Sequence, residues 1–448
     1  MAKAKGKARS AAGDAGTLAE SESGEPVGEA RATDDVVAAP IDAPAAVNDD
    51  DDALGLPGGD DDGEDDDDHG GDDDDDDDDD GEDLGPLLLG EAGRLPADWG
   101  PAPAGHRSGV VTLVGRPNAG KSTLLNAMLG EKLAITSPKP QTTRDLIRGY
   151  LTRPDMQAVL VDTPGIHMAK KGALLNRAMV GVAIEAMDAV DVALLVIDAK
   201  KTMDVLRNMP LTRDAKGVVQ TPTAEQAMQL CHRGDRAIVE RLQRYGHKIV
   251  VVLNKRDLVR PGEVLPLVAV YGSLPGVIAV VPVCARRAEG LDTLLEVVAP
   301  ALPEGPLLVD PELLTDRSER FLCGELLREA LFMALQEELP YQVAVVVERF
   351  DESGDPIHIL ATVCVERSTQ KGIVLGKGGL RMREIATRAR AEMEAMLQRR
   401  VYLEVYVKVE AEWTSRLDAL RRLGYGEGAE VAGSFGAGVA DESDWGEG

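Results

Sequence analysis

The chain has 448 residues and a formal net charge of −29 at pH 7. The charge belongs to the first 105 residues, which hold 33 acidic and 6 basic side chains, whereas the other 343 residues hold 45 and 43 and are almost neutral. This distribution excludes a uniformly acidic folded protein, and the nearly neutral part is long enough for two or three domains.

Segment 49–83 contains 23 Asp or Glu and no Lys or Arg. Like charge at this density cannot bury enough apolar surface to offset chain entropy. We therefore predict a disordered acidic extension over residues 1–105. Two roles are open for it: a solubilising segment, or a polyanion that competes with RNA for a basic surface elsewhere in the chain.

The start of the sequence, MAKAKGKARS, is basic, but no apolar run follows it, so we expect no secretory signal. No stretch approaches the roughly 18 apolar residues of a membrane span. The four cysteines include no CxxC pair. Scattered thiols fit a reducing cytosol and exclude a cysteine-rich zinc site.

Five short apolar runs follow Gly109. They are rich in β-branched residues and continuous rather than alternating, which is typical of strands buried on both faces of a parallel sheet. Segments with helical spacing, such as 224–245, separate them, so we predict a doubly wound α/β domain over residues 107–303. Ligands of such sheets lie at the carboxyl ends of the strands. The runs are 110–114, 158–162, 191–198, 248–254 and 277–283.

The motif GRPNAGKS, Gly115 to Ser122, lies between the first run and a predicted helix over 122–129. It matches GxxxxGK[ST], in which glycines let backbone N–H groups converge on phosphate oxygens and the helix N-terminus adds a positive dipole. We expect Lys121 to reach the β and γ phosphates and the Ser122 hydroxyl to bind Mg²⁺. The nucleotide-binding residues predicted here are Gly115, Asn118, Ala119, Gly120, Lys121, Ser122 and Thr123.

A second motif, DTPG, ends the second apolar run and contains Asp162 and Gly165. A carboxylate at this place can hold Mg²⁺ through water, and the glycine N–H can reach the γ-phosphate because no side chain intervenes. We therefore add Asp162 and Gly165 to the predicted nucleotide site. Gly165 and Lys121 are predicted to be catalytic residues.

A third motif, NKRD, ends the fourth run. Asp257 can accept both guanine N1–H and the exocyclic amine, whereas adenine would leave this carboxylate, which we expect to be buried, unpaired. VCA at 283–285 completes the series, with the Ala285 N–H positioned to bond guanine O6. The residues predicted on the base side are Asn254, Lys255, Asp257, Cys284 and Ala285.

A different unit follows a proline-rich linker over 304–314. Its predicted order, α-β-β-α-GxxG-α-β, is the layout of a type II KH domain over 315–425, and KH domains clamp single-stranded RNA at the GxxG loop. Residues 366–400 hold 9 basic and 4 acidic side chains, which favours RNA binding. The predicted RNA-binding residues are Gly376, Lys377, Gly378, Gly379 and Arg381. The last 23 residues, 426–448, are rich in glycine and acid, and we predict that they are disordered.

The first predicted helix of this KH-like unit covers residues 318–339. The predicted strands are 343–350, 357–366 and 401–410, and two helices flank the loop within 368–397.

The order GRPNAGKS, QTTRD, DTPGIH, NKRD and VCA resembles the Era-type branch of bacterial small GTPases. TDRSERF, ELPYQVAV and KVEAEWTSRLDALRRLGY extend the resemblance over about residues 107–425. The resemblance implies a GTPase that uses GTP, GDP and Mg²⁺, with Thr143 of QTTRD as the switch threonine. By this resemblance, Thr143 is a metal ligand together with Ser122 and Asp162. It is also a catalytic residue, together with Lys121 and Gly165.

For partners, the resemblance implies 16S ribosomal RNA near its 3′ end and a role in maturation of the 30S ribosomal subunit. It also implies a monomer in the cytoplasm that associates peripherally with the inner membrane.

The sequence departs from the family pattern in two places. Cys284-Ala285 replaces Ser-Ala, with little loss expected because the family contact there is mainly through the backbone. Residues 201–222 are longer than the family connection, and we expect a surface insertion without an assigned function.

Ile166 stands where Ras-type GTPases place a water-orienting glutamine. Related GTPases with a hydrophobic residue at that position hold potassium beside the residue that corresponds to Asn118, which adds K⁺ to the expected cofactors. The alternative is that Asn118 only braces the loop. Two other functions stay open: a GTP-binding RNA scaffold with negligible hydrolysis, and a GTPase whose KH-like unit binds protein.

Overall fold

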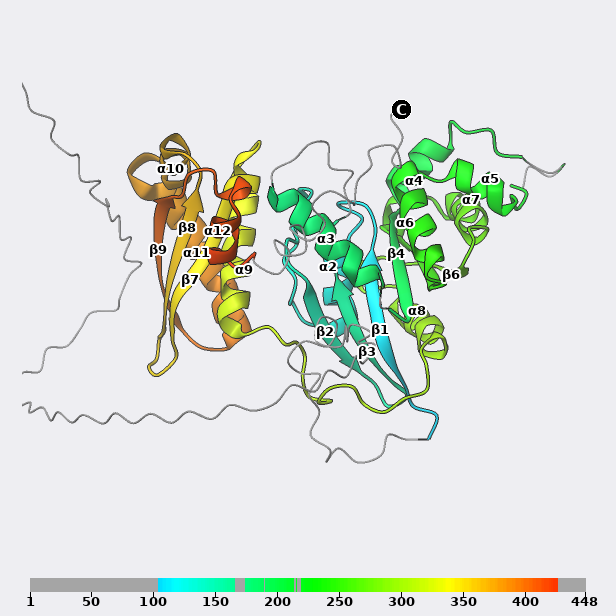
Figure 1. Cartoon of the computed structure of the whole chain (residues 1–448), viewed down its shortest axis with the longest axis horizontal. Coiled ribbons are helices and arrows are strands. Elements are labelled where there is room, and N and C mark those ends of the chain that lie inside the picture. The colour runs from blue at the N-terminus through cyan, green and yellow to red at the C-terminus, as the bar shows by residue number, and fades with distance from the viewer. Residues whose placement is uncertain (1–103, 166–173, 189, 213–214, 216–218, 426–448) are drawn as a thin grey trace, which may run out of the picture. The chain divides into compact units, whose positions relative to one another are not determined.

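The computed structural model describes residues 104–165, 174–188, 190–212, 215 and 219–425 (Figure 1). The predicted acidic extension, except for residues 104 and 105, lies outside the described residues, as does the predicted C-terminal tail. Both assignments therefore stay predictions.

The first folded unit is built on a six-stranded sheet with the strand order β2-β3-β1-β4-β5-β6. All five predicted strands are present and pair in parallel, which confirms the doubly wound α/β fold. The strands are β1 (Arg107–Val114), β2 (Ile147–Thr152), β3 (Met156–Asp162), β4 (Val192–Asp198), β5 (Lys248–Asn254) and β6 (Val277–Pro282).

The edge strand β2 was not predicted. The prediction of a parallel sheet is therefore wrong for this edge of the sheet. β2 runs antiparallel to β3, with Ile147 opposite Asp162 and Thr152 opposite Gln157. Only residues 153–155 connect the two strands, and so short a connection joins antiparallel neighbours because a parallel pair needs a crossover of a dozen or more residues. The pairing brings the segment before Ile147 beside Asp162.

Helices cover both faces of this sheet (Figure 1). On one face, α2 and α8 pack on inward side chains such as Leu113 and Val196, and on the other, α4, α6 and α7 pack on Leu195 and Ile197. The helices are α2 (Lys121–Leu129), α3 (Leu174–Asp188), α4 (Ala199–Leu206), α5 (Ala224–Leu230), α6 (Arg233–Arg244), α7 (Pro261–Gly272) and α8 (Leu291–Val298).

Two predictions in this unit need correction. The helical segment 224–245 is two helices, because Cys231 is extended and His232 caps α6 by accepting from the Gly234 N–H. Residues 201–206 of the presumed surface insertion belong to α4, in which Thr202 is 4% exposed and Leu206 is 1% exposed. This first part is packed against the sheet rather than looped over the surface.

The second folded unit has the predicted element order. Helices α9 and α11 pack in one core with a three-stranded sheet, β7-β8-β9, in which β9 is parallel to β8. The elements are α9 (Glu319–Ala334), β7 (Val343–Asp351), β8 (Ile357–Val365), α10 (Ser368–Leu375), α11 (Leu380–Leu397), β9 (Val401–Val409) and α12 (Leu417–Arg422). The first helix is shorter than predicted because the chain turns extended at Leu335.

The described residues also form short 3-10 helices: η2 (Arg256–Leu258), η3 (Ala285–Arg287), η4 (Ala299–Ala301), η5 (Leu339–Gln342), η6 (Lys377–Gly379) and η7 (Trp413–Ser415). Among the residues that the structure describes, no helix combines the length and apolar character needed to cross a membrane.

Candidate nucleotide-binding site

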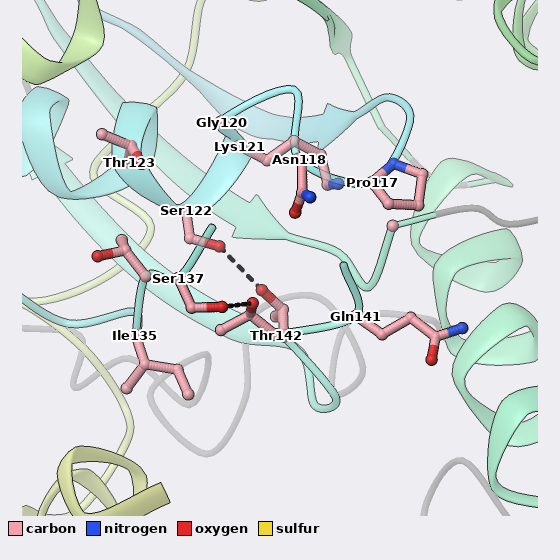
Figure 2. A pocket seen from close by; sticks show the side chains of 13 residues that line it. Pro117, Asn118, Gly120, Lys121, Ser122, Thr123, Ile135, Ser137, Gln141 and Thr142 are labelled. Atoms are coloured by element: carbon pink, nitrogen blue, oxygen red, sulfur yellow. Dashed lines mark hydrogen bonds between the residues drawn. The ribbon is translucent and has the colours of Figure 1, made fainter. Parts of the chain in front are cut away.

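A pocket lies where the phosphate loop between β1 and α2 meets the segment before β2 (Figure 2). Its lining includes Asn118, Lys121, Ser122, Thr143 and Gly165, all predicted from motifs. It also includes residues that motif reasoning missed, although Gln141 and Thr142 belong to QTTRD. Gly120 and Thr123 of the lining were also predicted, and the lining residues that were not predicted are Pro117, Ile135, Thr136, Ser137, Gln141 and Thr142.

The phosphate loop has the backbone that its glycines allow. Gly115 and Gly120 have φ of 148° and 99°, and a Cβ on Gly115 would lie 2.4 Å from the main-chain oxygen of Val196. Lys121 is buried, and its Nζ donates to the Gly115 oxygen at 3.3 Å. Burial lowers the pKa of Lys121, and Asp162 opposes that effect. The loop therefore holds a desolvated cation at the N-terminus of α2, where an anion is favoured.

Three oxygen-bearing side chains converge next to Lys121. Ser122 Oγ donates to Asp162 Oδ2 at 2.6 Å, and the hydroxyls of Ser122 and Thr143 are 2.8 Å apart. Thr143 Oγ1 also donates to Asp162 Oδ2, at 3.3 Å. Burial raises the pKa of Asp162, while Lys121 and both hydroxyls oppose the rise. Asp162 Oδ1 is buried without a hydrogen-bond partner among the described residues. Hard oxygen donors and an unsatisfied carboxylate oxygen suit Mg²⁺.

The NKRD motif braces the phosphate loop. Asn254 Nδ2 donates to the Ala119 oxygen at 2.9 Å, and Lys255 Nζ donates to the Asn118 oxygen at 2.6 Å. The Ala285 N–H donates to Asn254 Oδ1 at 3.1 Å. Its predicted bond to guanine O6 stays a prediction.

Asp257 lies exposed at the surface, so the protein's own side chains do not provide the burial expected for this carboxylate. The reason is that Asp257 sits in the turn after β5, where a bound base would have to supply the cover. Cys284 Sγ donates to Asp257 Oδ1 at 3.2 Å, and burial together with Asp257 raises the pKa of this thiol. The cysteine thus keeps a donor at the place where the family has serine.

Asn118 has a left-handed backbone, with φ of 62°, and its Nδ2 donates to the Pro138 oxygen at 2.8 Å. This bond ties the phosphate loop to the segment that leads into QTTRD. Ile166 lies outside the described residues, so the structure does not place it.

The predicted RNA loop combines three glycines with left-handed backbone: Gly376, Gly378 and Gly379 have φ of 71°, 59° and 76°. Lys377 and Gly378 are exposed. Arg381 donates to the Ile373 oxygen at 2.8 Å, so its guanidinium ties α11 to α10.

Motif reasoning missed two apolar side chains on either side of the RNA loop. Ile373 and Leu380 are 50% and 57% exposed. Their only signal in the sequence is that they flank GKGG.

An α/β domain with a phosphate loop, a Ser-Thr-Asp oxygen cluster and a guanine-type NKRD turn, followed by a KH-type unit, defines the class of P-loop GTPases with an RNA-binding module. Residues 110–255 match a family described as "50S ribosome-binding GTPase", and residues 338–414 match the KH domain family. A curated relative, GTPase Era of Syntrophus aciditrophicus (strain SB), is 41% identical over 323 residues, which cover 72% of this chain and 96% of the relative. The chain belongs to the Era family of GTPases.

Two solved Era structures resemble the chain at 34% identity, and each alignment covers 71% of this chain and 99% of the relative. One is Era in complex with Mg²⁺, GDPNP and nucleotides 1506–1542 of 16S ribosomal RNA, with a TM-score of 0.63. The other is a point variant of Aquifex aeolicus Era bound to GDP and aluminium fluoride, with a TM-score of 0.61.

Proposed function

We propose that the chain binds GTP with Mg²⁺ and hydrolyses it to GDP and phosphate. The observation that carries this proposal is the convergence of Ser122, Thr143 and Asp162 on one point beside the buried Lys121. Mg²⁺ bound there would neutralise charge that develops on the phosphate oxygens. The hydroxyls now satisfied by Asp162 would turn to the metal.

Lys121 and Gly165 face the transferred phosphate in this proposal. The Lys121 ammonium would replace its bond to the Gly115 oxygen by bonds to the β and γ phosphates, which satisfy a buried cation better than one carbonyl. At Gly165, a Cβ would lie 3.1 Å from Pro117 Cα and 3.3 Å from Lys121 Nζ. The absent side chain leaves room for its N–H to approach the γ-phosphate.

Guanine recognition falls to Asp257, whose two carboxylate oxygens can accept from the N1–H and the exocyclic amine. Cys284 already holds one of these oxygens, which fixes the carboxylate before the base arrives. Asn254 and Lys255 support the site indirectly, through the phosphate loop.

For the second unit, we propose binding of single-stranded RNA at GKGG, with 16S ribosomal RNA near its 3′ end as the ligand and the 30S subunit as the partner. The support is the left-handed glycine loop, the exposed Lys377 and the flanking Ile373 and Leu380, on which unstacked bases can lie. The related Era structure with a 16S segment supports the choice of RNA.

The proposal also includes a monomer in the cytoplasm with peripheral association at the inner membrane. Its support is the family resemblance, and cell fractionation with membrane washing at high salt tests it.

One experiment separates this function from its alternatives: GTP turnover and sequencing of crosslinked RNA, both on the full chain. We expect steady release of phosphate and crosslinks at the 3′ end of 16S RNA. Binding of GTP with no turnover would favour the RNA scaffold. Turnover without RNA crosslinks in ribosomal particles would favour a protein-binding KH unit.

A further inference from the structure

Besides the bond from Asn118 to Pro138, side chains of the described residues hold the phosphate loop on both its C-terminal and its N-terminal side. On its C-terminal side, Asn254 donates to the Ala119 oxygen and Lys255 to the Asn118 oxygen, at 2.9 and 2.6 Å. On its N-terminal side, the side chain of Arg116 is bound by residues that belong to none of the nucleotide motifs.

Arg116 Nε donates to Asp235 Oδ1 at 2.9 Å, and its Nη2 donates to Thr202 Oγ1 at 3.1 Å. Thr202 lies in α4 and is 4% exposed, whereas Asp235 is the third residue of α6 and is fully buried. Both helices pack on the same face of the sheet. The second residue of the phosphate loop is thus tied to two helices of the scaffold.

Both oxygens of Asp235 are used. Oδ2 accepts from the hydroxyl of Tyr271, at 2.8 Å, and Tyr271 is itself fully buried in α7. The carboxylate lies in the first turn of α6, where the helix dipole favours negative charge. It is therefore held in place by the helix, by Tyr271 and by Arg116 together.

An ion pair between the buried Asp235 and the half-buried Arg116 adds little net stability, because desolvation of the charges offsets their attraction. Its position suggests another role. Arg116 is followed by Pro117 and Asn118, which line the nucleotide pocket. Pro117 in turn is in contact distance of Gly165, since a Cβ there would lie 3.1 Å from Pro117 Cα.

We propose that Asp235 is a positioning residue for GTP hydrolysis. Through Arg116 it fixes the N-terminal arm of the phosphate loop, and this arm sets the position of Gly165 at the γ-phosphate. Gly120 and Lys121, which hold the β-phosphate, are on the side that Asn254 and Lys255 brace. Loss of the Arg116–Asp235 pair therefore slows hydrolysis while GDP still binds.

The test compares Asp235→Asn, Arg116→Gln and the double variant in the full chain. The measurements are kcat and KM for GTP, Kd for a fluorescent GDP analogue, and Tm. We expect each single variant to lower kcat by about 10-fold, because small displacements at a reacting centre have effects of this order or larger. The double variant should be no slower than Arg116→Gln, because Asp235→Asn and Arg116→Gln both remove the Arg116–Asp235 pair. GDP affinity should change by less than about 3-fold.

Asp316→Asn is the matched control. It breaks another buried pair, in which Arg148 donates to Asp316 at 2.8 Å with both side chains under 10% exposed. We expect this variant to lower Tm and to keep the wild-type kcat. A lower Tm with unchanged kcat in Asp235→Asn and Arg116→Gln overturns the proposal and leaves the pair a structural one. If Asp235→Asn does not fold, Thr202→Val replaces it in the test, because this variant removes only the bond between Arg116 and Thr202. An unchanged kcat in Thr202→Val would also contradict a positioning role for the Arg116 contacts.

Discussion

Arg144 Nη1 donates a 2.7 Å hydrogen bond to the main-chain oxygen of Val343, the first residue of β7. Arg144 directly follows Thr143, the predicted Mg²⁺ ligand. Its guanidinium also donates to the oxygens of Pro340 and Tyr341 and to the Tyr425 hydroxyl, and it lies over the rings of Phe332, Trp413 and Tyr425. The segment that contains the predicted switch threonine and the first strand of the KH unit are thus joined by the buried side chain of Arg144.

We predict that Arg144→Ala uncouples RNA binding from the nucleotide. The family resemblance implies that Thr143 responds to the γ-phosphate, and Arg144 is the adjacent residue that can pass its movement to β7. GTP affinity should stay within about 3-fold of wild type, whereas the ratio of RNA affinities with GDPNP and with GDP should fall toward one. RNA titrations in both nucleotide states measure the ratio.

Arg320→Ala is the control for this change, because Arg320 also donates to a β7 oxygen, that of Val347, at 2.9 Å, but from α9. It should keep the wild-type ratio. If Arg144→Ala keeps it as well, the coupling runs elsewhere.

Asp257→Asn should exchange guanine for xanthine. The asparagine amide can donate to the oxo group that replaces the exocyclic amine in xanthine. Opposite guanine, the amide N–H₂ and the exocyclic amine are both donors and cannot bond to each other. We expect preference for GTP to fall by about 100-fold or more, since sites that hydrogen-bond a substrate group discriminate strongly. Competition of GTP and XTP for the bound fluorescent nucleotide measures it. An unchanged preference for GTP would remove Asp257 from base recognition.

Lys377→Asp with Gly378→Asp should greatly weaken RNA binding and leave GTP hydrolysis intact. Two negative charges would face the phosphate backbone, where charge contacts dominate affinity, while the GTP site belongs to the other unit. Binding to a 3′-terminal 16S fragment should weaken by about 100-fold or more at low salt. Lys408→Asp, an exposed charge reversal on β9, should have a much smaller effect. Wild-type affinity in the double variant would contradict the KH assignment.

Potassium should accelerate GTP hydrolysis relative to sodium. Phosphoryl transfer needs positioning and charge neutralisation rather than a side-chain base, and Asn118, within the phosphate loop, offers its side-chain Oδ1 as a hard ligand. We expect turnover to rise about 10-fold in potassium and the rise to vanish in Asn118→Ala. Because Asn118 also bonds the Pro138 oxygen, a variant that slows equally in both salts would show a bracing role. Equal wild-type rates in matched buffers would exclude potassium and point to a group from a partner.

Deletion of residues 1–105 should leave GTP hydrolysis unchanged and tighten RNA binding at low salt, if the acidic segment competes for the basic surface. The gain should be about 3- to 10-fold near 50 mM salt and should fade above about 300 mM, because salt screens exposed charges. Affinity titrations of the full and shortened chains across this range measure it. Equal affinities at low salt would support a solubilising role instead.

The sequence by itself determined the fold class, the five parallel strands of the first unit, the element order of the second unit and the motif residues that line the phosphate pocket. These follow from local chemistry: buried parallel strands need continuous apolar runs, and a phosphate loop needs glycines at fixed spacing. The sequence could not show that Ala285 donates to Asn254 or that Asp257 lies exposed, because those facts depend on how separate loops meet.

Only the tertiary structure decided what the non-motif residues do. Thr202 and Asp235 are 86 and 119 residues away from Arg116, and Arg144 is 199 residues away from Val343. No spacing rule reaches that far, because such contacts are set by the packing of whole helices and strands. In the sequence, Thr202, Asp235 and Arg144 look like ordinary surface residues. Their burial in the folded protein is what requires each of them to have a hydrogen-bond partner.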